Sequence, residues 1–120
     1  MTFPKFVSKP WGHEEIWAVT DAYVAKYLYI KSGHRLSRQY HEIKEETIRV
    51  LKGILIIETG DDDTLSSQQL SPGEIFHVAP NTIHRFGAHR EDVILVEVST
   101  PEIDDVVRLA DDYNRTPDKS

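Results

Sequence analysis

The stretch GHRLSRQYHEIKEETIRVLKG, residues 33–53, holds three side chains that bind metals well, close together in the chain. Gln39 and His41 are two residues apart, so on a strand their side chains project from the same face. Glu46 follows five residues after His41, on the far side of a predicted turn. We therefore expect one hairpin to bring together an amide oxygen, an imidazole nitrogen and a carboxylate.

A fourth ligand is expected from residues 79–85, APNTIHR, where His84 follows a loop and begins a strand. With Gln39, His41 and Glu46 it forms a nitrogen and oxygen set that suits one divalent ion, with Zn as the first choice and Mn, Fe, Co or Ni as alternatives. A single histidine is more often a surface or core residue than a ligand, and only the joint spacing raises this set above that interpretation. The ordinary interpretation is kept for three other histidines: His13, His34 and His89.

Short segments rich in aromatic and β-branched residues alternate with turn residues over most of the chain. The predicted strand segments are EEIWAV (14–19), YVAKYLYIK (23–31), TIRVLKGILIIET (47–59, split at Lys52-Gly53), TLSSQQL (64–70), EIFHVA (74–79), IHRFGA (83–88) and VILVEV (93–98). Turn signals recur about every 8–12 residues, as in all-β sandwiches and barrels. We therefore predict an all-β fold with a barrel over about residues 9–100.

Past Pro101 the pattern changes. Ile103, Val106, Val107 and Leu109 follow helical spacing, which predicts one short C-terminal α-helix over about residues 103–113, packed outside the barrel.

Length and composition narrow the class of protein. With 120 residues, the chain is expected to form a single domain, 1–120, around one core. It has no cysteine, which excludes disulfides and thiolate metal sites. No apolar run approaches the roughly 20 residues that span a bilayer, and no secretory signal is evident, so a cytoplasmic location without membrane contact is expected. The net charge of −6 argues against nucleic-acid binding but allows a small anionic ligand.

The stretch 33–53 resembles the first motif of the cupin family, which consists of a Gly, then H-x-H, a Glu and a second Gly. Here Gly33, Gln39-Tyr-His41, Glu46 and Gly53 match it, with Gln39 in place of the first histidine. The second cupin motif, P-x-G-x-x-H, is matched more loosely by APNTIH, residues 79–84. Asn81 stands for its glycine, and asparagine tolerates positive φ, so we expect the turn to be retained. The resemblance implies a double-stranded β-helix, or jelly-roll barrel.

The chain is similar, more narrowly, to the cupin domain of type II mannose-6-phosphate isomerases, in which Gln at the first ligand position is typical. The matching segments are KPWGHEE (9–15), YVAK (23–26), LSRQYH (36–41), HR (84–85) and DDVVRLADDYNR (104–115). The family's H-H-H-R-x-E-H-W run is replaced by HEIKEETI, residues 41–48, which keeps its first His and its Glu.

This resemblance implies a metal-dependent sugar-phosphate isomerase that interconverts aldose and ketose through an enediolate, with a sugar or sugar phosphate as ligand and a homodimer as the assembly. His77, Glu97 or a metal-bound hydroxide is the candidate base. Arg85, Lys26 and Arg38 are candidates for binding the phosphate. Lys26 interrupts an apolar strand face, which fits a cavity-facing cation or an edge protector equally. The alternatives are a non-catalytic metal cupin that binds a sugar or another metabolite, and a metal-dependent oxygenase.

Overall fold

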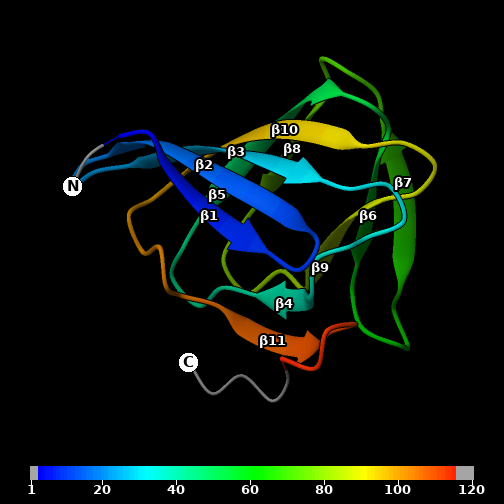
Figure 1. Cartoon of the computed structure of the whole chain (residues 1–120). Coiled ribbons are helices and arrows are strands. Elements are labelled where there is room, and N and C mark those ends of the chain that lie inside the picture. The colour runs from blue at the N-terminus through cyan, green and yellow to red at the C-terminus, as the bar shows by residue number, and fades with distance from the viewer. Residues whose placement is uncertain (1–2, 116–120) are drawn as a thin grey trace.

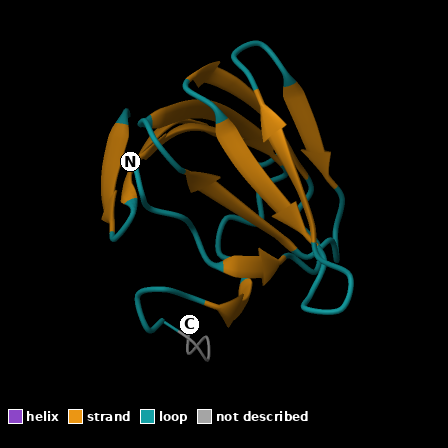
Figure 2. Cartoon of the chain, turned by 90° about the vertical axis from the view of Figure 1, so that its right-hand side faces the viewer, coloured by secondary structure: helices purple, strands orange, loops and turns teal. Residues whose placement is uncertain are grey.

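The computed structural model describes residues 3–115 as two antiparallel β-sheets with the hydrophobic core between them (Figures 1 and 2). The first sheet contains, in spatial order, β1 (Lys5–Lys9), β2 (Gly12–Val19), β3 (Val24–Ile30), β10 (Val93–Ser99), β5 (Glu46–Lys52) and β8 (Ile75–Val78). The second contains β11 (Val107–Ala110), β4 (Arg38–Tyr40), β9 (His84–Ala88), β6 (Leu55–Thr59) and β7 (Ser66–Leu70). Residues 3–115 include no helix, and therefore none long and apolar enough to span a membrane.

The predicted all-β character is confirmed, and each of the seven predicted strand segments contains a strand. Their aromatic and β-branched residues alternate between the core and solvent, as the two-residue period of a strand requires. β5, for example, buries Glu46, Ile48 and Val50 and exposes the residues between them to a greater degree. Three strands lie outside those segments: β1 and β11, which are at sheet edges, and the short β4.

The inward faces of the central strands change from apolar at one end to charged at the other. Across the β10–β3 pair, Val93 lies opposite Ile30, and four residues further along Glu97 lies opposite Lys26. All four residues are buried. Burial of charged groups costs free energy unless they are paired, so the charged end is where a functional site is expected.

The C-terminal helix predicted over residues 103–113 is wrong. Residues 107–110 form β11, which pairs antiparallel with β4. Ile103 and Leu109, which belong to the helical pattern, are 40% and 41% exposed, so the apolar positions do not share a buried face. A helix this short is marginal without such a face. β11 instead provides backbone hydrogen-bond partners to β4, which would otherwise be an unpaired edge.

Two turns near the ligand segments use left-handed backbone. Gly53 has φ 81°, and a Cβ there would lie 2.3 Å from the backbone oxygen of Asp92, so the turn between β5 and β6 requires glycine. Asn81 has φ 64°, which confirms that asparagine retains the turn before His84. The Asn81 N–H donates to the carbonyl of His41 over 2.7 Å and so joins the two ligand segments.

Replacement of Ile48 by alanine is expected to lower the free energy of unfolding by about 2–5 kcal/mol, because it removes a fully buried side chain from a central strand. Leu51→Ala, on the same strand but 46% exposed, is the matched control and should change stability by about 0.5 kcal/mol or less. Urea denaturation of the two variants measures the difference. Equal losses would show that the faces of β5 are assigned incorrectly.

Candidate metal centre

A cavity of about 440 Å³ lies between the two sheets, at the charged ends of their central strands. Its lining comes from both sheets and from the segment that leads into β11. The core closes it on one side, since Leu28 and Phe86 contribute both to the core and to the cavity wall. The result is a chamber with an apolar wall and a few convergent polar groups, the usual form of a small-molecule site.

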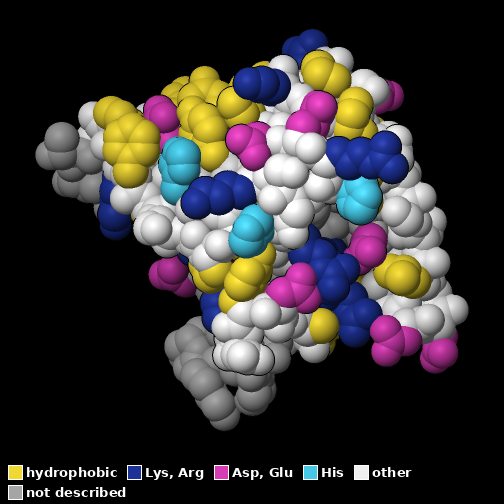
Figure 3. All heavy atoms as spheres, turned by 45° about the vertical axis from the view of Figure 1, so that its right-hand side comes forward, with side chains coloured by type: hydrophobic (Ala, Val, Ile, Leu, Met, Phe, Trp, Pro, Cys, Tyr) yellow, Lys and Arg dark blue, Asp and Glu magenta, His cyan; other side chains and the backbone are white. Residues whose placement is uncertain are grey.

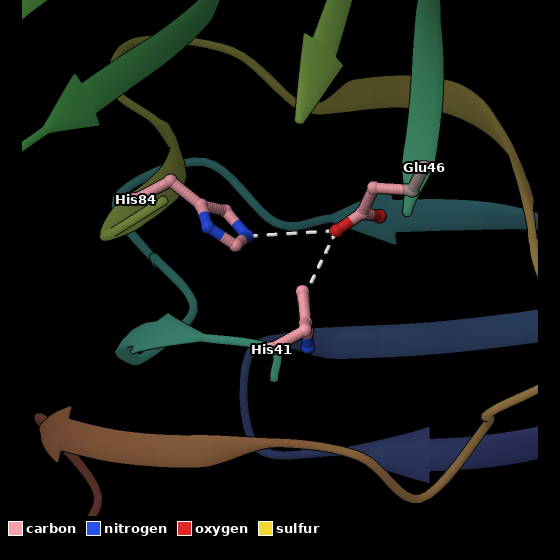
Figure 4. Close-up of side chains that lie close together, drawn as sticks. All are labelled: His41, Glu46 and His84. Atoms are coloured by element: carbon pink, nitrogen blue, oxygen red, sulfur yellow. Dashed lines mark hydrogen bonds and ion pairs between the residues drawn. The ribbon is translucent and has the colours of Figure 1, made fainter. Parts of the chain in front are cut away.

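His41, Glu46 and His84 converge in this cavity from three different segments (Figure 4). His41 follows β4 directly, Glu46 begins β5 and His84 begins β9. The Nε2 atom of His41 lies 3.0 Å from Oε1 of Glu46, and the Nε2 atom of His84 lies 3.5 Å from the same oxygen. One ligand atom from each residue falls within 4.8 Å of the other two. This group could hold a metal ion.

The hydrogen bonds of the two imidazoles make a cation the best occupant. The Nδ1 atom of His41 lies 2.6 Å from the carbonyl of Asp105, and that of His84 lies 2.9 Å from the carbonyl of Thr82. A carbonyl only accepts, so each Nδ1 carries a proton and each ring turns its Nε2 atom inward, where it is free to serve as the metal-binding nitrogen. Both Nε2 atoms face the Glu46 carboxylate: that of His41 is within hydrogen-bond distance of it, whereas that of His84 is buried with no hydrogen-bond partner among the described residues. A divalent ion at this point would be held by both nitrogens and by the carboxylate.

Glu46 is held as a carboxylate. Burial alone would raise its pKa, but His41, His84 and the charge of Lys44 lower the pKa well below the ordinary value. A deprotonated ligand of this kind binds a metal without first losing a proton.

A second buried carboxyl group, Glu97, lies beside the metal-binding group. Its Oε2 atom is 3.0 Å from Nζ of Lys44 and 3.8 Å from Nζ of Lys26, which also lies 3.2 Å from Glu14. Burial, followed by the charge of Glu46, raises the pKa of Glu97, although both lysines oppose that shift. The pKa of Lys44 is raised despite its burial, because Glu97 and Glu46 stabilise the ammonium. The cavity therefore contains buried acidic and basic side chains that pair with one another.

Three further residues of the predicted site line the cavity with the histidines and Glu46: Gln39, Lys26 and Glu97. Gln39 lies opposite His84 in the β4–β9 pair, which suits a fourth ligand position. Lys26 lies on β3, an interior strand, so the cavity-facing interpretation applies and the edge interpretation does not.

The structure places Arg85, Arg38 and His77 away from this cavity. Arg85 follows His84 on β9 and so points to the opposite face of the sheet, where its guanidinium donates to the carbonyl of Leu36 and to Asp112. Arg38 points outward and pairs with Asp62.

His77 is half-exposed on β8 and pairs with Glu45. A second cavity, of about 210 Å³, includes Arg85 on the outer face. Figure 3 shows basic and acidic side chains intermixed on the surface that it views.

Sequence reasoning missed Lys44 and Asp105. Lys44 is buried in the cavity wall, and the signal was present, since it stands where the family run H-H-H-R-x-E has arginine. Asp105 accepts hydrogen bonds from the backbone N–H groups of residues 42, 43 and 44 over 3.1, 2.7 and 2.8 Å. These bonds lower its pKa although burial opposes the shift. No sequence signal connects Asp105 with that loop, which lies 61 to 63 residues earlier.

Asp105→Ala is expected to weaken metal binding by about 10- to 100-fold, the usual effect of removing an outer support of a ligand. The substitution removes the acceptor for three N–H groups in the loop after His41 and frees the backbone that holds His41 Nδ1. Competition with a chromophoric chelator measures the affinity. Asp104→Ala removes a neighbouring charge that also lines the cavity, and should have little effect. Equal losses in both variants would assign the effect to charge rather than to positioning.

A family model described as "Mannose-6-phosphate isomerase C-terminal" matches residues 2–111. No curated protein matches the sequence. The match covers both ligand segments and the segment that leads to β11.

Several solved structures share the fold. The capsular polysaccharide assembling protein CapF of Staphylococcus aureus has 16% sequence identity and a TM-score of 0.77, over 88% of this chain and 34% of that one. KdgF of Halomonas sp. has 22% identity and a TM-score of 0.72, over 83% and 90% of the two chains. Rru_A2000 of Rhodospirillum rubrum, described as a cupin-2 domain, has 14% identity and a TM-score of 0.71, over 82% and 65%. The chain spans about a third of CapF, and these identities establish the cupin fold alone.

Proposed function

Because the chain belongs to the mannose-6-phosphate isomerase C-terminal family, we propose that it is a metal-dependent sugar-phosphate isomerase that interconverts an aldose and a ketose. The observation that carries the proposal is the pair of imidazole Nε2 atoms turned inward around Glu46, with the separate carboxyl group of Glu97 in the same cavity. Isomerisation needs these two elements, a centre that stabilises negative charge on oxygen and a group that moves a proton between neighbouring carbons.

The proposed ligands are His41, Glu46, His84 and Gln39, which give two nitrogens and two oxygens. This set suits zinc first, with manganese, iron, cobalt or nickel as alternatives. When bound, the ion supplies a Lewis acid that polarises the substrate carbonyl and stabilises the enediolate.

Glu97 is the proposed proton carrier. It lines the cavity beside the metal-binding group without belonging to the three convergent ligands. Its Oε2 atom forms ion pairs with the ammonium groups of Lys44 and Lys26, and these ion pairs fix the position of the carboxylate. Glu97 would take a proton from one carbon of the sugar and return it to the next. Leu28 and Phe86 form an apolar wall of the same cavity.

Turnover tests this proposal. Protein loaded separately with each candidate metal is incubated in D₂O with a panel of hexose and heptose phosphates, and NMR detects the ketose or aldose product and deuterium at C1 of the ketose or C2 of the aldose. Product with deuterium incorporation is expected, because an enediolate exchanges its proton with solvent. Stoichiometric metal without product or exchange on any substrate would contradict isomerisation.

A non-catalytic sugar-phosphate-binding cupin is the second candidate, and one observation favours it. The family's histidine-rich run is replaced around His41, and Ile43 in that loop is 67% exposed. For this candidate we expect thermal stabilisation of the metal-loaded protein by sugar phosphates, with no product and no deuterium exchange.

A further inference from the structure

Cationic side chains gather at the mouth of the metal cavity. The two-residue period of β1 turns Lys5 and Lys9 toward the cavity. Arg108 on β11 and Arg115 just beyond it line the same cavity from the other sheet. β1 and β11 are edge strands of different sheets, so the cations reach the mouth from both sides.

The cavity is positive although the whole chain has a net charge of −6. Among residues 3–115, six basic and five acidic residues line it. A divalent ion at the His41, Glu46 and His84 group would therefore leave an excess of about three positive charges, with the histidines neutral. Local positive charge in a protein of negative net charge attracts an anionic ligand to that place.

The basic residues differ in what they already contact. Deep in the cavity, Lys26 pairs with Glu14, and Lys44 pairs with Glu97. At the mouth, the pKa of Lys9 lies below its ordinary value because of burial, and the charges of Lys26, Arg108 and Arg115 lower it further against the opposing effect of Glu14. Because these cations line the same cavity, an anion among them would relieve their mutual repulsion.

Arg115 is held at the mouth by Asp111. The Asp111 carboxylate accepts hydrogen bonds from the backbone N–H and from two guanidinium nitrogens of Arg115, over 2.7 to 3.1 Å. The guanidinium is therefore oriented before any ligand arrives, which reduces the entropic cost of binding.

We propose that Lys9 and Arg108, supported by Arg115, form an anion subsite that binds the phosphoryl group of the ligand while its sugar oxygens face the metal centre. The subsite rests on the proposed function for the sugar end of the ligand. It replaces Arg85 and Arg38, which the sequence had suggested for this role and which lie on the outer face of the five-stranded sheet.

Calorimetric titration of the zinc-loaded protein with mannose 6-phosphate, mannose and inorganic phosphate tests the subsite without requiring turnover. Mannose 6-phosphate is expected to bind at least about 10-fold more tightly than mannose, since a hydrogen bond to a charged group has that effect or more. Lys9→Met and Arg108→Gln should each reduce this preference by about 10-fold and leave the affinity for mannose and the metal content unchanged. Lys52→Met, which removes an exposed cation at the end of β5, is the matched control and should bind all three probes as the wild type does.

These titrations test the anion subsite independently of the isomerase activity. A phosphate preference that Lys9→Met and Arg108→Gln abolish supports the subsite even if no isomerisation occurs. Binding of inorganic phosphate alone, with the same dependence on both residues, assigns the subsite to free phosphate rather than to a sugar phosphate. The proposal is overturned if mannose 6-phosphate and phosphate do not bind at millimolar concentration, or if both variants retain the wild-type preference.

Discussion

His84→Ala is expected to weaken the binding of a divalent ion by more than about 100-fold, since even the loss of an outer support costs about 10- to 100-fold and this change removes a ligand itself. His84 is 1% exposed and its Nε2 has no hydrogen-bond partner within the described structure. In the alanine variant, therefore, no neighbouring group is placed to supply the missing nitrogen ligand. Elemental analysis of the purified protein, together with chelator competition, measures the change. The stabilisation that metal gives to the wild type in thermal unfolding should be lost with it.

His89→Ala is the control for this experiment, because His89 is exposed and lies outside the metal cavity. Its metal content should equal that of the wild type. Gln39→Ala, measured in parallel, tests the fourth ligand, and we expect a partial loss because an amide oxygen is the weakest donor of the set. Full metal retention by His84→Ala would disprove the metal centre.

Glu97→Gln is expected to reduce turnover by about 100- to 10,000-fold, the usual contribution of a positioned acid or base, while the metal content stays unchanged. The substitution keeps the size of the side chain but removes its ability to carry a proton. Steady-state kinetics with the substrate found in the isomerase assay, and deuterium exchange at C1 of the ketose or C2 of the aldose, measure the effect. Exchange should be lost together with turnover.

His77→Ala is the matched test of the other base suggested by the sequence. His77 is half-exposed and paired with Glu45 outside the cavity, so turnover should remain at the wild-type level. If Glu97→Gln retained full activity, or if His77→Ala lost it, the assignment of the proton carrier would be wrong.

The contrast between His84 and Arg85 shows which site residues could be predicted. His84 could be found because it stands at a motif position after a turn, and the turn itself follows from Asn81. Arg85 was assigned to the same site because it is adjacent in sequence, yet neighbouring residues on a strand face opposite sides of the sheet. Adjacency in the chain is therefore evidence against a shared site on a strand, whereas a separation of two favours it.

The residues after Pro101 show that a local sequence pattern can predict the wrong type of secondary structure. Helical spacing of apolar residues predicted a helix there, but the segment forms β11 against β4. That pairing joins residues about 70 positions apart and satisfies backbone groups that a sequence pattern does not describe. The same long-range placement brings Asp105 to the loop after His41 and Arg108 to the cavity mouth.

The sequence by itself predicted most of the strands and the candidate ligand set of His41, Glu46 and His84, with Gln39 as a fourth candidate. A two-residue period and a turn act over a few residues, so they can be recognised locally. Only the tertiary structure decided which faces meet: the carboxyl group of Glu97 beside Lys44, the support from Asp105, and the cations of β1 and β11 at one mouth. Each of these contacts joins segments that are distant in the chain, and their closeness depends on strand order and on the packing of two sheets, which no local spacing encodes.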